Sequence, residues 1–198
     1  MHKNNKGFSL IELIVVIAIL AVMVGFLTLS LRTLLGTEAM ECADKVSAKI
    51  SSVKTGSMSM FNETMELGYH EKGGDYPSDG FYTTCRVQTI DKNASLVDAT
   101  TPEIRKVGSK KVVIKATYSD GSQQQISGTE CLVVKFKRST GAFDYVGYKA
   151  NHTDADAVYV TNLAGDPMHL VKLSFTCGGR TYSIDMVPET GKHTVKRD

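Results

Sequence analysis

Residues 8–31 read FSLIELIVVIAILAVMVGFLTLSL and are far more apolar than the chain as a whole. They contain one charged residue, Glu12, and three other polar residues, Ser9, Thr28 and Ser30. As an α-helix, these 24 residues extend about 36 Å, which is enough to cross a hydrocarbon layer of about 30 Å. We therefore expect residues 8–31 to form a membrane-spanning helix, which argues against an ordinary soluble cytoplasmic protein.

A short polar and basic leader, MHKNNKG, precedes this run as residues 1–7. A secretory signal peptide has an apolar stretch of only about 7–15 residues, followed by small residues at its cleavage site. The run here is longer, and the residues after it fit a cleavage site poorly. An uncleaved signal anchor would explain the run, with Lys3 and Lys6 on the cytoplasmic side. It would not explain why a carboxylate, Glu12, stands near the start of an apolar helix.

The segment Lys6-Gly7-Phe8-Ser9-Leu10-Ile11-Glu12-Leu13 resembles the processing site of type IV prepilins and the related pseudopilins. The resemblance covers about the first 30 residues and combines leader, glycine, aromatic residue, glutamate and apolar run at fixed offsets. It implies that a prepilin peptidase/methyltransferase cuts between Gly7 and Phe8 and that the new N-terminus at Phe8 is methylated. Glycine suits the cleavage point because it has no side chain to hinder the peptidase.

The resemblance also implies a role for Glu12 in filament assembly. Opposite charges about 4 Å apart attract by several kcal/mol in a half-buried environment. Glu12 of one subunit can therefore neutralise the Phe8 ammonium of a neighbour as the helix leaves the bilayer, and this pair would set the register of packed helices. Many major pilins have a proline inside this helix, whereas the first proline here is Pro77. That difference leaves a minor pilin or a pseudopilin open.

Residues 32–57 continue the helical pattern beyond the membrane run. The apolar residues follow one another at intervals of three or four, which places them on one face of an amphipathic helix; they are Leu35, Ala39, Cys42, Val46, Ile50 and Val53. We expect the charged residues to lie on other faces; they are Glu38, Glu41, Lys45 and Lys49. Gly56 is a candidate end signal, so one helix is expected from about Phe8 to Thr55.

The remainder divides into a connector at 58–80, rich in glycine, and a β-rich exported domain at 81–198. Expected strands are rich in Val, Ile, Thr, Tyr and Phe and lie at 81–90, 111–118, 129–137, 142–148, 157–161, 169–177 and 180–187. Several alternate apolar and polar residues, which predicts an antiparallel sheet with one buried face. The expected fold class is therefore α+β and pilin-like, with a long N-terminal helix, half membrane-spanning and half amphipathic, packed on an antiparallel sheet. The hairpin between Leu173 and His193 also loosely resembles H-type minor pseudopilins.

Four cysteines, Cys42, Cys85, Cys131 and Cys177, all lie on the exported side in this topology. An even number there permits two disulfides, and four cysteines allow three pairings. We take 42–177 with 85–131 as one hypothesis and four buried free thiols as the other.

Neither catalysis nor a cofactor is indicated. The chain has no GxSxG, P-loop or CxxC motif and no metal-ligand spacing, and His152, Asp154 and Asp156 are more typical of a solvated loop than of a cation site. The 198 residues include 23 basic and 21 acidic side chains, a balance that argues against bulk nucleic-acid binding. Two basic groups nevertheless keep DNA capture under consideration; they are Lys106, Lys110, Lys111 and Lys115, and Lys192, Lys196 and Arg197.

These observations favour a structural subunit of a type IV pilus-like filament, most simply a minor pilin. Its partners would be other pilin or pseudopilin subunits, contacted through the N-terminal helix. It would span the cytoplasmic membrane once, with its C-terminal domain exported, before joining a surface pilus or pseudopilus. The alternatives are a pseudopilin of a type II secretion-like system, a competence pilin for DNA uptake, and a membrane-anchored binding protein or enzyme with an uncleaved anchor.

Overall fold

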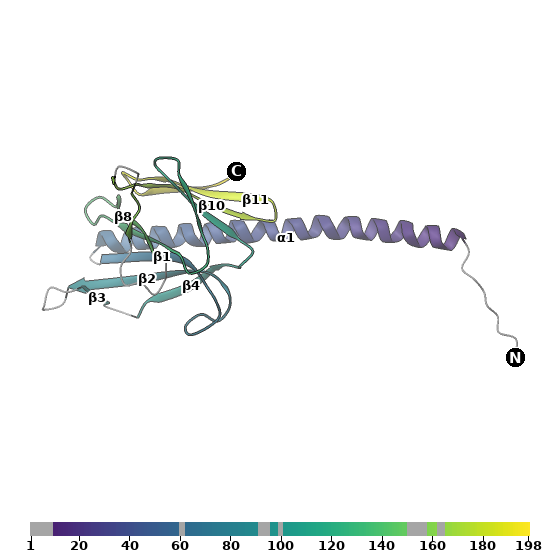
Figure 1. The fold of residues 1–198 in the computed structure, drawn as a ribbon, viewed down its shortest axis with the longest axis horizontal. Coiled ribbons are helices and arrows are strands. Elements are labelled where there is room, and N and C mark those ends of the chain that lie inside the picture. Colours follow the sequence, from purple (N-terminus) through teal and green to yellow (C-terminus); the bar gives the residue numbers. More distant parts are fainter. Residues whose placement is uncertain (1–9, 60–61, 91–95, 99–100, 150–157, 162–164) are drawn as a thin grey trace.

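The computed structural model describes residues 10–59, 62–90, 96–98, 101–149, 158–161 and 165–198. One helix, α1 (Leu10–Ser59), is followed by twelve strands. Its N-terminal half projects from the β-domain, and its C-terminal half lies within it (Figure 1). At 1.5 Å per residue, the 50 residues of α1 extend about 75 Å.

The helix runs past the glycine expected to end it. Gly56 lies inside α1, against the side-chain carboxylate of Glu63, and a larger residue would collide with that group. After Gly56 the Ser57 hydroxyl donates to the Glu63 carbonyl at 3.3 Å, which ties the helix end to the first strand. The glycine therefore permits close packing rather than ending the helix.

The first sheet has seven strands, all joined by antiparallel pairs. Its order is β3 (Leu96–Asp98), β2 (Gly80–Ile90), β1 (Asn62–His70), β7 (Cys131–Phe136), β8 (Phe143–Lys149) and β9 (Val158–Tyr159), and β4 (Glu103–Gly108) also pairs with β2. The second sheet has five strands. Its order is β12 (Lys192–Arg197), β11 (Arg180–Val187), β10 (Leu170–Cys177), β5 (Val113–Tyr118) and β6 (Gln123–Ile126).

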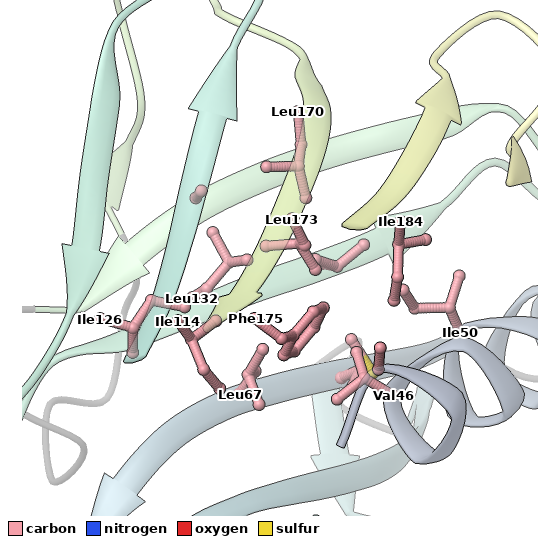
Figure 2. Close-up of a cluster of buried hydrophobic side chains, with 14 of the residues drawn as sticks. Val46, Ile50, Leu67, Ile114, Ile126, Leu132, Leu170, Leu173, Phe175 and Ile184 are labelled. Carbon is pink, nitrogen blue, oxygen red and sulfur yellow. The ribbon is translucent and has the colours of Figure 1, made fainter. Parts of the chain in front are cut away.

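The core forms where α1 contacts strands of both sheets (Figure 1). Val46 and Ile50 of the helix point towards Phe175 and Ile184 of the second sheet, and Leu67 of β1 closes the cluster from the first sheet (Figure 2). All five side chains are fully buried. Burying an aliphatic or aromatic side chain of this size contributes roughly 1.5–3 kcal/mol to the stability of the fold. These contacts between α1 and the two sheets therefore hold the helix in the domain.

Each of the seven expected strands contains a strand of the structure, and a helix followed by antiparallel sheets confirms the α+β class. The connector expected at 58–80 is wrong in its first half, because residues 62–70 form β1, between β2 and β7. Its apolar Met65 and Leu67 face α1, while Glu66 is buried on the opposite face. That buried carboxylate and Gly68 obscured the strand pattern. Strands β3, β4, β6 and β12 were also not predicted.

Candidate functional site

The projecting part of α1 exposes many large hydrophobic side chains. Thirteen large hydrophobic side chains between Leu10 and Phe26 are exposed, from 48% at Val16 to 77% at Leu10. Together they exceed the ~300–600 Å² of the largest apolar patch on a typical soluble monomer. Over the described part of the chain, no helix meets the combined length and hydropathy required to cross a membrane.

Of the three residues expected to act in processing and assembly, the structure describes one. Glu12 lies in the first turn of α1 and is exposed. A carboxylate there interacts favourably with the positive end of the helix dipole. Gly7 and Phe8 lie outside the described residues, so the expected cleavage point and the Phe8–Glu12 pair stay predictions.

The other half of α1 is anchored by burial. The apolar stripe was correctly predicted, because Ala39, Cys42, Val46, Ile50 and Val53 are all fully buried. The Leu35 side chain lies outside the described part of the helix. The stripe therefore attaches the C-terminal half of α1 to both sheets.

Polar contacts along α1 reinforce this attachment. At the start of the packed half, the Ser109 hydroxyl donates to Glu38 Oε2 at 2.8 Å. Near its end, the Lys54 ammonium donates to the Thr190 carbonyl at 2.9 Å. Between them, His193 Nε2 of β12 lies 3.1 Å from the Ser47 carbonyl oxygen. The helix is thus tied to the turns and strands on both sides of its buried stripe.

Lys49, expected on a face of the helix other than the apolar stripe, is covered there by β4. Its side chain is only 10% exposed and forms an ion pair with Glu103 of β4, which is 53% exposed. The hydrogen bond from Lys49 lowers the pKa of Glu103. Burial is the main cause of the raised pKa of the nearby Glu63, which the charge of Lys49 lowers and that of Glu103 raises. Helical spacing alone could not predict the burial of Lys49, because the sheets determine which helix faces besides the apolar stripe are covered.

A second buried ion pair, also missed by the sequence reasoning, lies on the face of the first sheet that points away from α1. Lys149 Nζ of β8 donates to Glu66 Oε1 of β1 at 2.8 Å, and both side chains are about one-tenth exposed. Arg86 Nε lies 3.8 Å from the same carboxylate oxygen. Tyr76 stacks on His70 over this face, with ring centroids 3.9 Å apart.

All four cysteines are buried free thiols in the structure, the second of the two hypotheses for them. The 85–131 pairing is wrong. Cys85 lies opposite Met65 and Cys131 opposite Gly68, on strands that flank β1. The two residues are therefore separated by two strand spacings and three residues, about 14 Å, against a limit of about 7 Å for a disulfide.

Cys42 and Cys177, in contrast, lie near one another. Cys177 Sγ is 3.9 Å from Glu38 Oε2, one helical turn before Cys42. Burial is the main cause of the raised pKa of each thiol, to about 12 for Cys42, and a charge on Cys177 would raise it further. The 42–177 disulfide stays a prediction.

Two of the lysines considered for DNA capture are engaged within the domain, and the three residues considered for a cation fall outside the described ranges. Lys106 donates to Ser78 Oγ at 2.7 Å and to the Asp79 carbonyl at 2.8 Å, and Lys196 pairs with Asp185 at 2.7 Å. His152, Asp154 and Asp156 lie outside the described residues. Among those that are described, no group of three His, Cys, Asp or Glu side chains is arranged to hold a metal ion.

Comparison with known proteins identifies one motif. A family model for the prokaryotic N-terminal methylation motif matches residues 2–28. No curated protein and no solved structure matches the chain. The match lies over the leader and the exposed half of α1, and it supports a type IV prepilin-like family for this chain.

Proposed function

We propose that this chain is a type IV pilin-like precursor that is cut between Gly7 and Phe8, methylated on Phe8 and assembled into a filament. The prokaryotic N-terminal methylation motif at residues 2–28 supports a prepilin or pseudopilin precursor. Within that class we propose a minor pilin. The proposed role is structural: the chain supplies a filament core through its helix and a surface through its domain.

The exposed apolar half of α1 is the observation that carries this proposal. Thirteen large hydrophobic side chains cannot remain in water without a strong drive to association. Because the same helix continues unbroken into the core of the domain, burying its exposed half also fixes where the domain lies. A lipid bilayer and a bundle of identical helices can each bury these apolar side chains. The same helix surface would therefore contact lipid before assembly and neighbouring subunits after it.

Glu12 would guide the second step. The new ammonium at Phe8 and a carboxylate of a neighbouring subunit attract by about 4 kcal/mol at 4 Å in a half-buried environment. An unpaired carboxylate in an apolar bundle is costly, so only a helix register that pairs Glu12 would be stable.

The N-terminus of the protein isolated from membranes tests processing. In cells that contain a prepilin peptidase, intact mass and peptide sequencing should find a chain that begins at methylated Phe8. Gly7→Leu should leave residues 1–7 attached, whereas the matched leader variant Asn5→Ala should be processed normally. A wild-type chain that still begins at Met1 would support an uncleaved anchor instead.

Assembly is tested separately with Glu12→Ala and the shape-matched Glu12→Gln. Both variants should be processed yet be largely absent from sheared filaments, whereas Ser9→Ala should assemble as the wild type does. Incorporation of Glu12→Ala at the wild-type level would show that the charge pair does not set the register. Co-purification with filament, secretion or DNA-uptake components would then decide between a minor pilin, a pseudopilin and a competence pilin.

A further inference from the structure

Three cations surround α1 at the end of the domain from which its exposed half leaves. Lys110 and Lys111 lie in the turn between β4 and β5, and Arg180 follows the Gly178–Gly179 turn between β10 and β11. The Arg180 side chain covers Gly36, and Ser109 bonds to Glu38. Both turns therefore lie beside the first packed turn of the helix (Figure 1). We call Lys110, Lys111 and Arg180 the basic collar.

None of the three collar cations has an ion-pair partner among the described residues. No described carboxylate lies within ion-pair distance of these three side chains, whereas Lys45 pairs with Glu41 at 3.3 Å. Glu38 is nearby, but it accepts a hydrogen bond from Ser109 and contacts Cys177. Both lysines are exposed, so their charge faces outward from the domain.

Three acidic residues lie at the same end, further from α1. Glu71, Asp75 and Asp79 belong to the loop between β1 and β2. Lys106 of β4 ties this loop down by donating to the Asp79 carbonyl. The three collar cations thus lie in turns beside the helix, whereas these three carboxylates belong to a separate loop.

We propose that the basic collar rests on anionic phospholipid headgroups while the exposed half of α1 spans the bilayer. This inference depends on the proposed function, because it requires the helix to enter a membrane. A hydrocarbon layer of about 30 Å takes up about 20 helical residues, so a helix that starts at Phe8 leaves it near Thr28. Gly36 then lies about 12 Å above the hydrocarbon, and the headgroup layer fills about 5–7 Å of that interval.

The remaining gap is within reach of the collar. An extended lysine or arginine side chain spans most of it, and the Debye length at physiological ionic strength is about 8 Å. A basic residue close to an anionic surface strengthens binding about fivefold. The collar would therefore hold the domain upright on the membrane, yet loosely enough to release it when the helix enters a filament.

Lysine footprinting of the full mature chain tests this contact. The protein is reconstituted in nanodiscs of phosphatidylcholine alone or with phosphatidylglycerol, treated briefly with acetic anhydride, and digested for mass spectrometry. Lys137, in the turn at the opposite end of the domain, is the internal reference. Relative to Lys137, acetylation of Lys110 and Lys111 should be about fivefold slower in the anionic bilayer, and about 0.5 M NaCl should abolish the difference.

Arg180→Gln should weaken the protection of both lysines, whereas Arg138→Gln, a matched change in the turn that contains Lys137, should leave it intact. Equal acetylation in neutral and anionic bilayers would overturn the collar proposal while leaving the proposed function standing. A chain that inserts into neither bilayer would overturn the proposed membrane stage itself, and the collar proposal with it.

Discussion

Lys49 of α1 forms an ion pair with Glu103 of β4, at the edge where the helix meets the first sheet. The lysine is buried and the carboxylate is half exposed. The charge of the ammonium is therefore stabilised mainly by Glu103, whereas the carboxylate also contacts water. It is one of several contacts that attach the C-terminal half of α1 to the β-domain.

Glu103→Gln should destabilise the domain at neutral pH by about 1–2 kcal/mol, less than for a fully buried pair because Glu103 is half exposed. The folded-state pKa of Glu103 is lowered by Lys49, so its contribution is present above the unfolded pKa and is lost as pH falls through the folded pKa. The difference between variant and wild type should therefore be largest near pH 7 and close to zero near pH 3. Urea unfolding of the solubilised chain at several pH values measures it.

Glu189→Gln, another exposed glutamate, is the control and should change stability by less than about 0.5 kcal/mol at either pH. A Glu103→Gln effect that stays constant down to pH 3 would show that lost packing, rather than lost charge, is responsible.

Lys149→Met should cost about 3–5 kcal/mol, because it leaves the Glu66 carboxylate buried without its closest partner. The double variant Glu66→Gln/Lys149→Met should recover most of that loss, since the remaining cation, Arg86, is about one-third exposed and can turn to solvent. A double-mutant cycle in urea measures the coupling, and additive effects would mean that the pair contributes nothing beyond its separate side chains.

Ile50→Ala should lower the free energy of unfolding by about 2–5 kcal/mol, because Ile50 is fully buried between helix and sheet. Met40→Ala, on the same helix with 46% of its side chain exposed, is the matched control and should cost under about 0.5 kcal/mol. Similar losses for both variants would contradict the assignment of the buried face.

Native Cys42, Cys85 and Cys131 should resist alkylation. Burial raises the pKa of each thiol to about 12, so at pH 8 the thiolate fraction is about a thousandfold below that of an exposed cysteine. Iodoacetamide labelling followed by mass spectrometry measures the rates, and labelling in urea without reductant counts the thiols. The structure predicts four equivalents in urea. Two equivalents, with Cys42 and Cys177 unlabelled, would establish the 42–177 bridge instead.

Local patterns were sufficient for much of the architecture. The apolar run and the three-and-four spacing predicted one long helix with a buried stripe, and period-two alternation predicted strands such as β7 and β10, because these periods follow directly from backbone geometry. The motif around Gly7, Phe8 and Glu12 was readable for a similar reason, because it consists of residue types at short fixed offsets.

Contacts between distant segments could not be read in this way. Strand β1 was hidden because its Glu66 is buried and becomes tolerable only once Lys149, 83 residues later in the chain, lies beside it. Helical spacing placed Lys49 on a face away from the apolar stripe, but it could not show that Glu103 of β4 pairs with it there. The separation of Cys85 from Cys131 and the gathering of Lys110, Lys111 and Arg180 around α1 likewise depend on strand order. The amino-acid sequence thus predicted a long helix, strands and a candidate processing motif, because these patterns are local. The partners of the buried charges and the positions of the thiols and exposed cations depend on long-range packing, so only the tertiary structure decided them.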